Sequence, residues 1–176
     1  MRKQKGFSLI ELLIVVAIIL IIAAIAIPNL LRARIAANES SAVSSIRTIN
    51  TAMVTYNSSY PTVGYSTDLK SLGGATPCIP ASTSACLIDN VLALDGTPAG
   101  SGKSGYNIAA AGVAAAGLNT TYIAGAAPLK WNQTGVRRFC AVEDAVVRAD
   151  PNSGGSTTPE NTHDTCLGNP YVPLNQ

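Results

Sequence analysis

One carboxylate, Glu11, lies near the start of an otherwise apolar segment, KGFSLIELLIVVAIILIIAAIAIPNLL, at residues 5–31. Leu12 to Ile27 is an unbroken apolar run, and a helix from Phe7 to Ile27 would reach roughly 30 Å, the thickness of a bilayer. A charge within such a span costs on the order of 3 kcal/mol or more, unless it is hydrated at headgroup depth or paired. Glu11 is therefore a candidate for an electrostatic role with a specific partner.

The cation that would pair with Glu11 has to come from outside the apolar run. The N-terminal lysines lie before the span, and Arg32 is about six helical turns away. If the chain is cut after Gly6, however, Phe7 gains a free α-amino group with a pKa near ~8, one turn from Glu11. We expect this amine to pair with Glu11 between neighbouring copies of the chain.

The basic front end also fits a secretory signal peptide, but the residues after the span do not. Arg2, Lys3 and Lys5 precede the apolar run, as in a signal peptide. A cleavage site with small residues should then follow, whereas PNLLR at residues 28–32 continues a helical pattern. Because three basic residues precede the span, the positive-inside tendency should keep the N-terminus cytoplasmic and export the rest of the chain.

The motif GFSLIE at residues 6–11, with a basic leader before it and the apolar run after it, resembles that of a type IV prepilin. This family includes type IV pilins and the pseudopilins of type II secretion. The resemblance implies that a prepilin peptidase cuts after Gly6 and methylates the new N-terminal amine on Phe7. It also implies that Glu11 neutralises the amine of an adjacent subunit and that Pro28 is the family's helix-breaking proline.

The resemblance further implies a structural protein and not an enzyme. Its partners would be copies of itself in a helical filament, the prepilin peptidase and a pilus assembly platform. The prepilin would lie in the inner membrane and later join an extracellular pilus on the cell surface. Residues 134–150 look like those of type IVa pilins, whereas Tyr60-Pro61 and the short head also resemble the major pseudopilin.

Two other functions stay open at this point. One is a pseudopilin of a type II secretion system or a minor pilin, which would be processed but would build only a short fibre or its tip. The other is a membrane-anchored binding domain that keeps its leader and never polymerises.

Composition agrees with one membrane helix and one modest globular domain. The chain has 176 residues, of which 47% are apolar and 12% are charged. Of its 12 basic residues, three lie in the leader at residues 1–6, so removing the leader leaves 9 basic against 10 acidic residues. A nearly neutral mature chain argues against nucleic-acid binding driven by general basicity.

Four cysteines follow the span, in the part of the chain that we expect to be exported to a compartment that permits disulfides. Three pairings are possible, and spacing does not choose among them. We favour Cys78–Cys86, which closes a small loop, and Cys140–Cys166, which ties back the C-terminal tail. The second pair resembles the C-terminal disulfide-bounded loop of the prepilin family. Each bridge would add ~2–4 kcal/mol of stability.

Other motifs that could do chemistry are incomplete. A zinc site is disfavoured because His163 is the only histidine and no C-x-x-C pair occurs. The segment 96–105 resembles a phosphate-binding loop but has Thr97 where glycine is required, and the segment 150–161 resembles a calcium loop but has Asn161 where an acidic residue is expected. We therefore predict no catalytic residue, no metal and no cofactor.

The motif must be carried by a long N-terminal helix, which we predict over residues 7–57. Its hydrophobic half is 7–31, where Pro28 should kink or loosen the helix without necessarily ending it. Its amphipathic half is 32–57, with apolar residues every three or four positions: Val43, Ile46, Ile49, Met53 and Tyr56.

The remainder, residues 58–176, should form a small head. We predict one helical turn at 68–72, stopped by Gly73-Gly74, and antiparallel strands at 120–129, 135–142 and 145–150. A turn at Glu143-Asp144 joins the last two strands, and the tail beyond should be a loop, ordered only where Cys166 holds it. A sheet packed on the amphipathic helix gives an α+β fold, the ladle fold of pilins by resemblance.

Overall fold

The computed structural model describes residues 7–95, 102–151 and 153–174. Contacts divide the chain into two units, residues 1–34 and residues 35–176, which we describe separately. Helix α1 contributes to both, and the second unit holds all the other elements. The elements in chain order are α1 (Leu9–Ser59), η1 (Lys70–Leu72), α2 (Asn90–Ala93), β1 (Tyr106–Ala115), β2 (Leu118–Pro128), β3 (Arg138–Val142), β4 (Arg148–Asp150), α3 (His163–Leu167) and β5 (Val172–Pro173).

Helix α1 begins and ends two residues later than predicted. It remains helical through Pro28, as expected of a proline that loosens a helix without ending it. One window of α1, with a mean hydropathy of 3.3, has none of its residues buried. By length and composition α1 can therefore cross a membrane.

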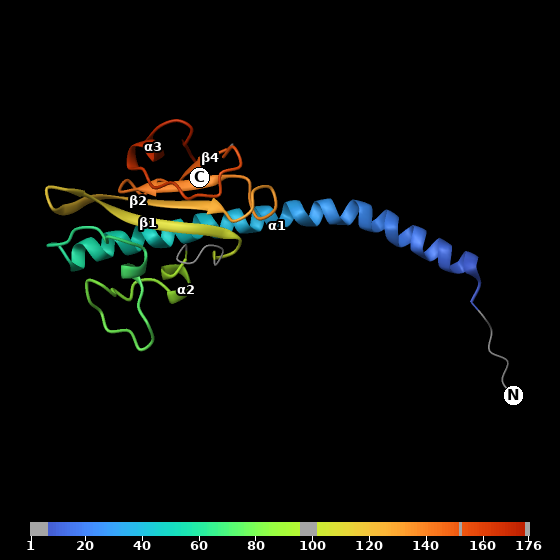
Figure 1. Cartoon of the computed structure of the whole chain (residues 1–176), viewed down its shortest axis with the longest axis horizontal. Helices are drawn as coiled ribbons and strands as arrows, with labels where there is room; N and C mark the ends of the chain where they lie inside the picture. The colour runs from blue at the N-terminus through green and yellow to red at the C-terminus, as the bar shows by residue number, and fades with distance from the viewer. Residues whose placement is uncertain (1–6, 96–101, 152, 175–176) are drawn as a thin grey trace. The chain divides into compact units, whose positions relative to one another are not determined.

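The second unit is built on a five-stranded antiparallel sheet with the order β1-β2-β3-β4-β5. β1 and β2 form a hairpin whose two turn residues, Ala116 and Gly117, have φ angles of 54° and 87°. Positive φ at both turn positions is what a two-residue hairpin with the usual strand twist requires. Figure 1 shows the hairpin beside the C-terminal half of α1.

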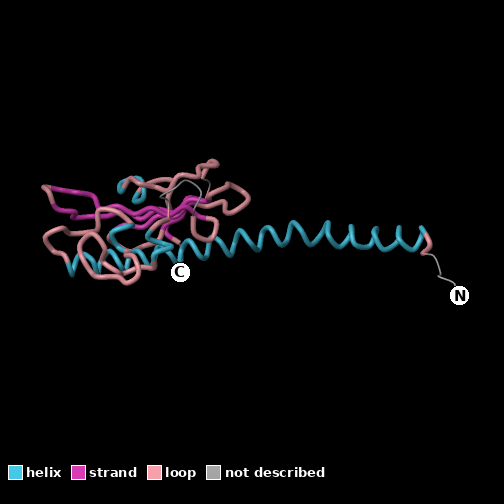
Figure 2. Tube along the Cα trace, turned by 60° about the horizontal axis from the view of Figure 1, so that its bottom comes forward, coloured by secondary structure: helices cyan, strands magenta, loops and turns pink. Residues whose placement is uncertain are grey.

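The core of this unit lies between α1 and one face of the sheet. The predicted amphipathic stripe is confirmed, because Ile46, Ile49, Met53 and Tyr56 are all buried and Val43, which is partly buried, packs against the same cluster. They share one hydrophobic cluster with residues of the sheet, among them Tyr106, Tyr122 and Phe139. Figure 2 shows the strands gathered into one sheet along this part of the helix. The α+β fold is therefore as predicted.

Alternation along β3 divides the sheet into two faces. Phe139 and Ala141 belong to the cluster that includes α1, whereas Cys140 and Val142 belong to a second cluster with Cys166 of α3. Successive side chains of a strand point to opposite faces, so β3 can serve both layers. The helix α1, the sheet and α3 thus form three layers in this unit (Figure 1).

An ion pair and hydrogen bonds of one buried carboxylate, Glu39, also join α1 to the head. Oε1 of Glu39 accepts hydrogen bonds of 3.1 Å from the backbone N–H groups of Val136 and Arg137. Oε2 lies 2.7 Å from a guanidinium nitrogen of Arg137. Glu39 is buried, so these partners compensate its lost hydration.

The three predicted strands correspond to β2, β3 and β4, but two strands were not predicted. β1 has the sequence YNIAAAGVAA, whose many alanines have low strand propensity, and it is held by antiparallel pairing with β2. β5 pairs with β4 through Val172 and Pro173. Pairing with a neighbour, which the local sequence does not reveal, fixes both strands.

The prediction that the tail is a loop was wrong for two short segments. Residues 163–167 form α3, with Thr162 at the N-cap position and Asp164 in the first turn. Residues 172–173 form β5. The predicted turn at 68–72 is present as the 3-10 helix η1, which ends at Gly73.

Candidate functional site

The N-terminal end of α1 brings together the residues that the sequence singled out for chemistry. Ser8 precedes the first helical residue, and its carbonyl accepts the first hydrogen bond of the helix from the N–H of Leu12. The backbone N–H of Ser8 donates to Oε2 of Glu11 at 2.9 Å. This is the carboxylate half of an S-x-x-E capping box, a signal that our sequence reasoning missed.

Glu11 is therefore held toward the N-terminal end of its own helix. Only Oε2 makes a hydrogen bond among the described residues, which leaves Oε1 for another partner. Phe7 is 78% exposed and lies one residue before the donor of that bond. The backbone nitrogen of Phe7 and the carboxylate of Glu11 thus belong to the same end of the helix. Gly6, the predicted cleavage position, lies outside the described residues.

The surface of α1 beyond Glu11 is apolar on every side. All large hydrophobic residues from Leu9 to Leu31 are between 43% and 75% exposed. A helix that is hydrophobic all round needs lipid or other protein around it. Pro28 is exposed on this stretch, so packing against other residues of the same chain does not account for a proline at this position.

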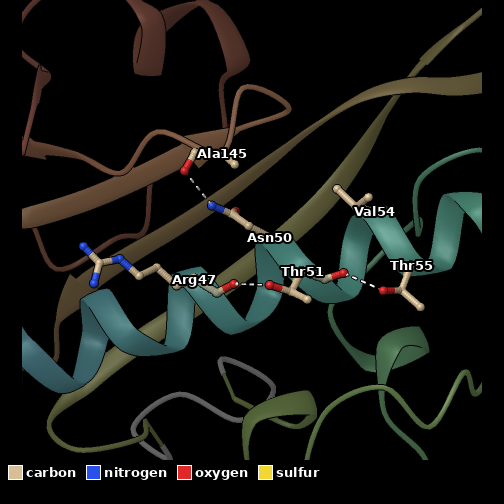
Figure 3. Close-up of a pocket in the computed structure, with 6 residues that line it drawn as sticks. All are labelled: Arg47, Asn50, Thr51, Val54, Thr55 and Ala145. Atoms are coloured by element: carbon tan, nitrogen blue, oxygen red, sulfur yellow. Dashed lines mark hydrogen bonds between the residues drawn. The ribbon is translucent and has the colours of Figure 1, made fainter.

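The second unit has an open groove of about 490 Å³ between α1 and the turn after β3, shown in Figure 3. The hydroxyls of Thr51 and Thr55 donate to carbonyls of α1 itself, and Nδ2 of Asn50 donates to the carbonyl of Ala145 at 3.3 Å. Among the described residues that line the groove, Arg47 is the one ionisable side chain. This described lining therefore holds no nucleophile with an activating base.

Both disulfides that the sequence analysis favoured are present. Cys140–Cys166 joins β3 to α3 over a separation of 26 residues, and Cys78–Cys86 closes a loop with a separation of 8. The longer bridge lies in the second hydrophobic cluster, on the face of the sheet away from the α1 cluster. It therefore fastens the C-terminal segment to the sheet.

His163 lies on α3 inside this disulfide-bounded segment. Its Nε2 is 2.9 Å from the carboxylate of Glu143, and its Nδ1 is 3.1 Å from that of Asp164. The hydrogen bond with Asp164, followed by that with Glu143, raises the pKa of His163 above its ordinary value. The imidazole thus links the C-terminal segment to the turn between β3 and β4.

Two sequence motifs remain outside a full structural test. Residues 96–101 of the loop resembling a phosphate site, and Asn152 of the loop resembling a calcium site, lie outside the described residues. In the part of the chain that the structure describes, no group of three or more His, Cys, Asp and Glu side chains could hold a metal ion.

Comparison with known proteins finds one family model and several named relatives. The model of the prokaryotic N-terminal methylation motif matches residues 1–27. Over 40 residues, or 23% of this chain and 30% of the relative, the sequence is 68% identical to the type IV wide pilus major component PilA4 of Thermus thermophilus. No solved structure matches the chain.

Two further relatives come from pili and from secretion. The type II secretion system core protein G of Vibrio cholerae is 43% identical over 65 residues, 35% of this chain and 44% of the relative. The type IV major pilin protein PilA of Myxococcus xanthus is 45% identical over 54 residues, 31% of this chain and 24% of the relative.

The matches thus cover less than half of the length of these curated relatives. The homologues are structural pilins and pseudopilins, not enzymes. The chain thus carries the prokaryotic N-terminal methylation motif, and its N-terminal part is similar to type IV pilins and to core protein G of type II secretion systems.

Proposed function

We propose that this chain is the structural subunit of a type IV pilus filament, assembled through its N-terminal helix. The observation that carries the proposal is the exposed apolar stretch of α1 from Leu9 to Leu31, with one carboxylate, Glu11, at its N-terminal end. Such a surface is stable in lipid and also against other copies of itself. The helix can therefore serve first as a membrane anchor and then as filament core.

Processing at Gly6 would supply the partner that Glu11 needs. A prepilin peptidase removes residues 1–6 and methylates the new amine of Phe7, which keeps its positive charge. The mature subunit then consists of the helix at residues 7–57 and the head at residues 58–176. It waits in the inner membrane until an assembly platform adds it to the pilus.

Pairing between subunits follows from charge burial. When apolar helices pack together, the amine of Phe7 and the carboxylate of Glu11 both leave water, and an unpaired charge there is strongly unfavourable. Oε2 of Glu11 is occupied by the Ser8 N–H, so Oε1 is the atom offered to a neighbour's amine. Each added subunit would complete one such pair.

The geometry of this contact favours a fibre. When the amine of each copy pairs with the carboxylate of the next copy and not reciprocally, the contact is head-to-tail. A head-to-tail contact that does not close into a ring continues as a helical filament.

A second candidate is a pseudopilin of a type II secretion system or a minor pilin. The similarity to core protein G of Vibrio cholerae, over 35% of this chain, favours this alternative. The same processing and the same pairing would serve it, but its fibre would stay short. The two candidates therefore differ in where the processed chain accumulates.

Mass spectrometry of sheared filaments and of membranes tests the proposal. Intact mass and the N-terminal peptide identify the form of the chain in each fraction. An abundant sheared species beginning with methylated Phe7 is expected for a major pilin. A processed species confined to membranes supports the second candidate, and an uncut form beginning at Met1 contradicts both.

A further inference from the structure

Two charges bracket the apolar part of α1 at a distance that matches a membrane. Between Glu11 and Arg32 lie the 20 residues from Leu12 to Leu31, and none of them is charged. As a helix these residues rise ~30 Å, which is about the thickness of the hydrocarbon layer. When Glu11 lies at the headgroups on one side, Arg32 reaches the headgroups on the other.

Arg32 and Arg34 point to opposite sides of the helix. Residues two positions apart in an α-helix differ by about 200° around the helix axis and by ~3 Å along it. Both arginines are exposed on a continuous helix, so two guanidinium groups flank α1 at nearly the same depth. A protein partner docks on one face of a helix, whereas a layer of headgroups surrounds it.

The described part of the first unit, residues 7–34, offers these arginines no anion. Within it neither guanidinium makes a hydrogen bond or ion pair. Glu11 is about six turns away. Glu39, the next carboxylate along α1, is buried and already paired with Arg137. The arginines are therefore available for an external anion.

Phosphate is the anion that suits this place. The guanidinium fork binds phosphate oxygens in a bidentate manner, and its long apolar stem can lie along a membrane helix while the head reaches the interface. Removal of residues 1–6 takes away Arg2, Lys3 and Lys5, so Arg32 and Arg34 are then the cationic side chains next to the span. The mature subunit would still have a charged anchor on one side.

We propose that Arg32 and Arg34 bind lipid phosphate groups at the outer surface of the membrane and fix the depth of α1 before assembly. The inference rests on the membrane stage of the proposed function. It adds a binding site for the headgroups of phospholipids, and it implies that these two contacts must break when a subunit leaves the membrane.

Solid-state NMR can test the contact directly. The processed full chain, with ¹³C-labelled arginine guanidinium groups, is reconstituted in bilayers of phosphatidylethanolamine and phosphatidylglycerol. Magnetisation transfer from guanidinium carbon to lipid phosphorus is expected. The transfer should be lost in the double variant R32Q/R34Q and retained in R47Q, a matched control because Arg47 is an exposed arginine further along α1.

A depth measurement tests the second half of the proposal. Because the described structure has no free cysteine, Leu30→Cys introduces a single reactive thiol for a spin label. The depth of this label below the phosphates should shift in R32Q/R34Q and stay unchanged in R47Q. An unchanged depth in the double variant would overturn the claim that the arginines position the helix.

The remaining outcomes separate this inference from the proposed function. Insertion of the helix into the bilayer without magnetisation transfer to lipid phosphorus would overturn the inference alone. Transfer from the guanidinium carbon to a carboxylate of a neighbouring copy would do the same. A further sample uses glycolipid bilayers, which contain no phosphorus, with added inorganic phosphate. Transfer from guanidinium carbon to this free phosphate would show that the ligand is a free ion and not a lipid, and would also overturn the inference. Release of the chain from membranes by alkaline carbonate would overturn both the inference and the membrane stage of the function.

Discussion

Replacing Glu11 with glutamine separates the two roles that its carboxylate can play. A glutamine side chain keeps an oxygen that can accept the Ser8 N–H, whose bond to Oε2 of Glu11 is 2.9 Å long. It loses the negative charge that a neighbour's amine would need. Alanine at the same position loses both. Glu11→Gln and Glu11→Ala should therefore both fail to form fibres only if the charge of Glu11 is the decisive property.

The expected magnitudes differ enough to decide between these roles. Loss of a helix cap costs ~1 kcal/mol, whereas an unpaired buried charge costs about 3–5 kcal/mol. A penalty of about 3 kcal/mol weakens the addition of each subunit by roughly two orders of magnitude. Glu11→Gln should therefore prevent fibre formation almost as completely as Glu11→Ala, and Glu11→Asp should retain part of it.

The assay is the yield of sheared fibres relative to the processed chain in membranes, measured by mass spectrometry. Ser8→Ala is a matched control, because the Ser8 group that bonds to Glu11 is its backbone N–H, which alanine keeps. Normal fibres from Glu11→Gln together with failure of Glu11→Ala would refute the charge pairing and leave the helix cap as the role of Glu11.

Further predictions concern processing and the head. Gly6→Val should leave the precursor uncut, so the intact mass of the membrane form would include residues 1–6; a processed chain would contradict the assigned cleavage position. Replacing Cys140 with serine should lower the free energy of unfolding of the purified chain by ~3–4 kcal/mol, because it opens a loop whose ends are 26 residues apart, as denaturant titration would show. The raised pKa of His163 means that its ion pairs stabilise the head below the ordinary imidazole pKa and are lost as pH rises through the raised value. The free energy of unfolding should therefore fall by less than ~1 kcal/mol from acidic to alkaline pH, which would appear as a modest fall in the thermal midpoint. Glu143→Gln should flatten this pH dependence.

The helix and its two environments could be predicted from the sequence because both signals are local. An apolar run long enough for a bilayer and a stripe repeating every three or four residues need no tertiary information. Ile46, Ile49 and Met53 are buried for the reason that their spacing indicates. The strands β2, β3 and β4 lie where short apolar segments between turn residues indicated strands, although burial along them is continuous and does not alternate.

The features that were missed depend on partners distant in the sequence. β1 is rich in alanine, and its Gly112 lies so close to Asn119 and Ser66 that a Cβ atom there would approach within 2.8 Å of both. Its strand structure thus reflects close packing against β2 and a nearby loop. The pair of Glu39 with Arg137 joins residues 98 positions apart, so no local pattern could indicate it.

Glu11 differs from these cases because its contact with Ser8 could have been predicted from the S-x-x-E pattern of residues 8–11 alone. The capping bond to Ser8 holds the carboxylate at the end of the helix where cleavage would create a cation. A carboxylate that is already oriented loses less conformational entropy on binding an amine than a freely rotating one. We therefore expect the cap to strengthen the pairing between subunits, so that the local and the intermolecular role of Glu11 support each other.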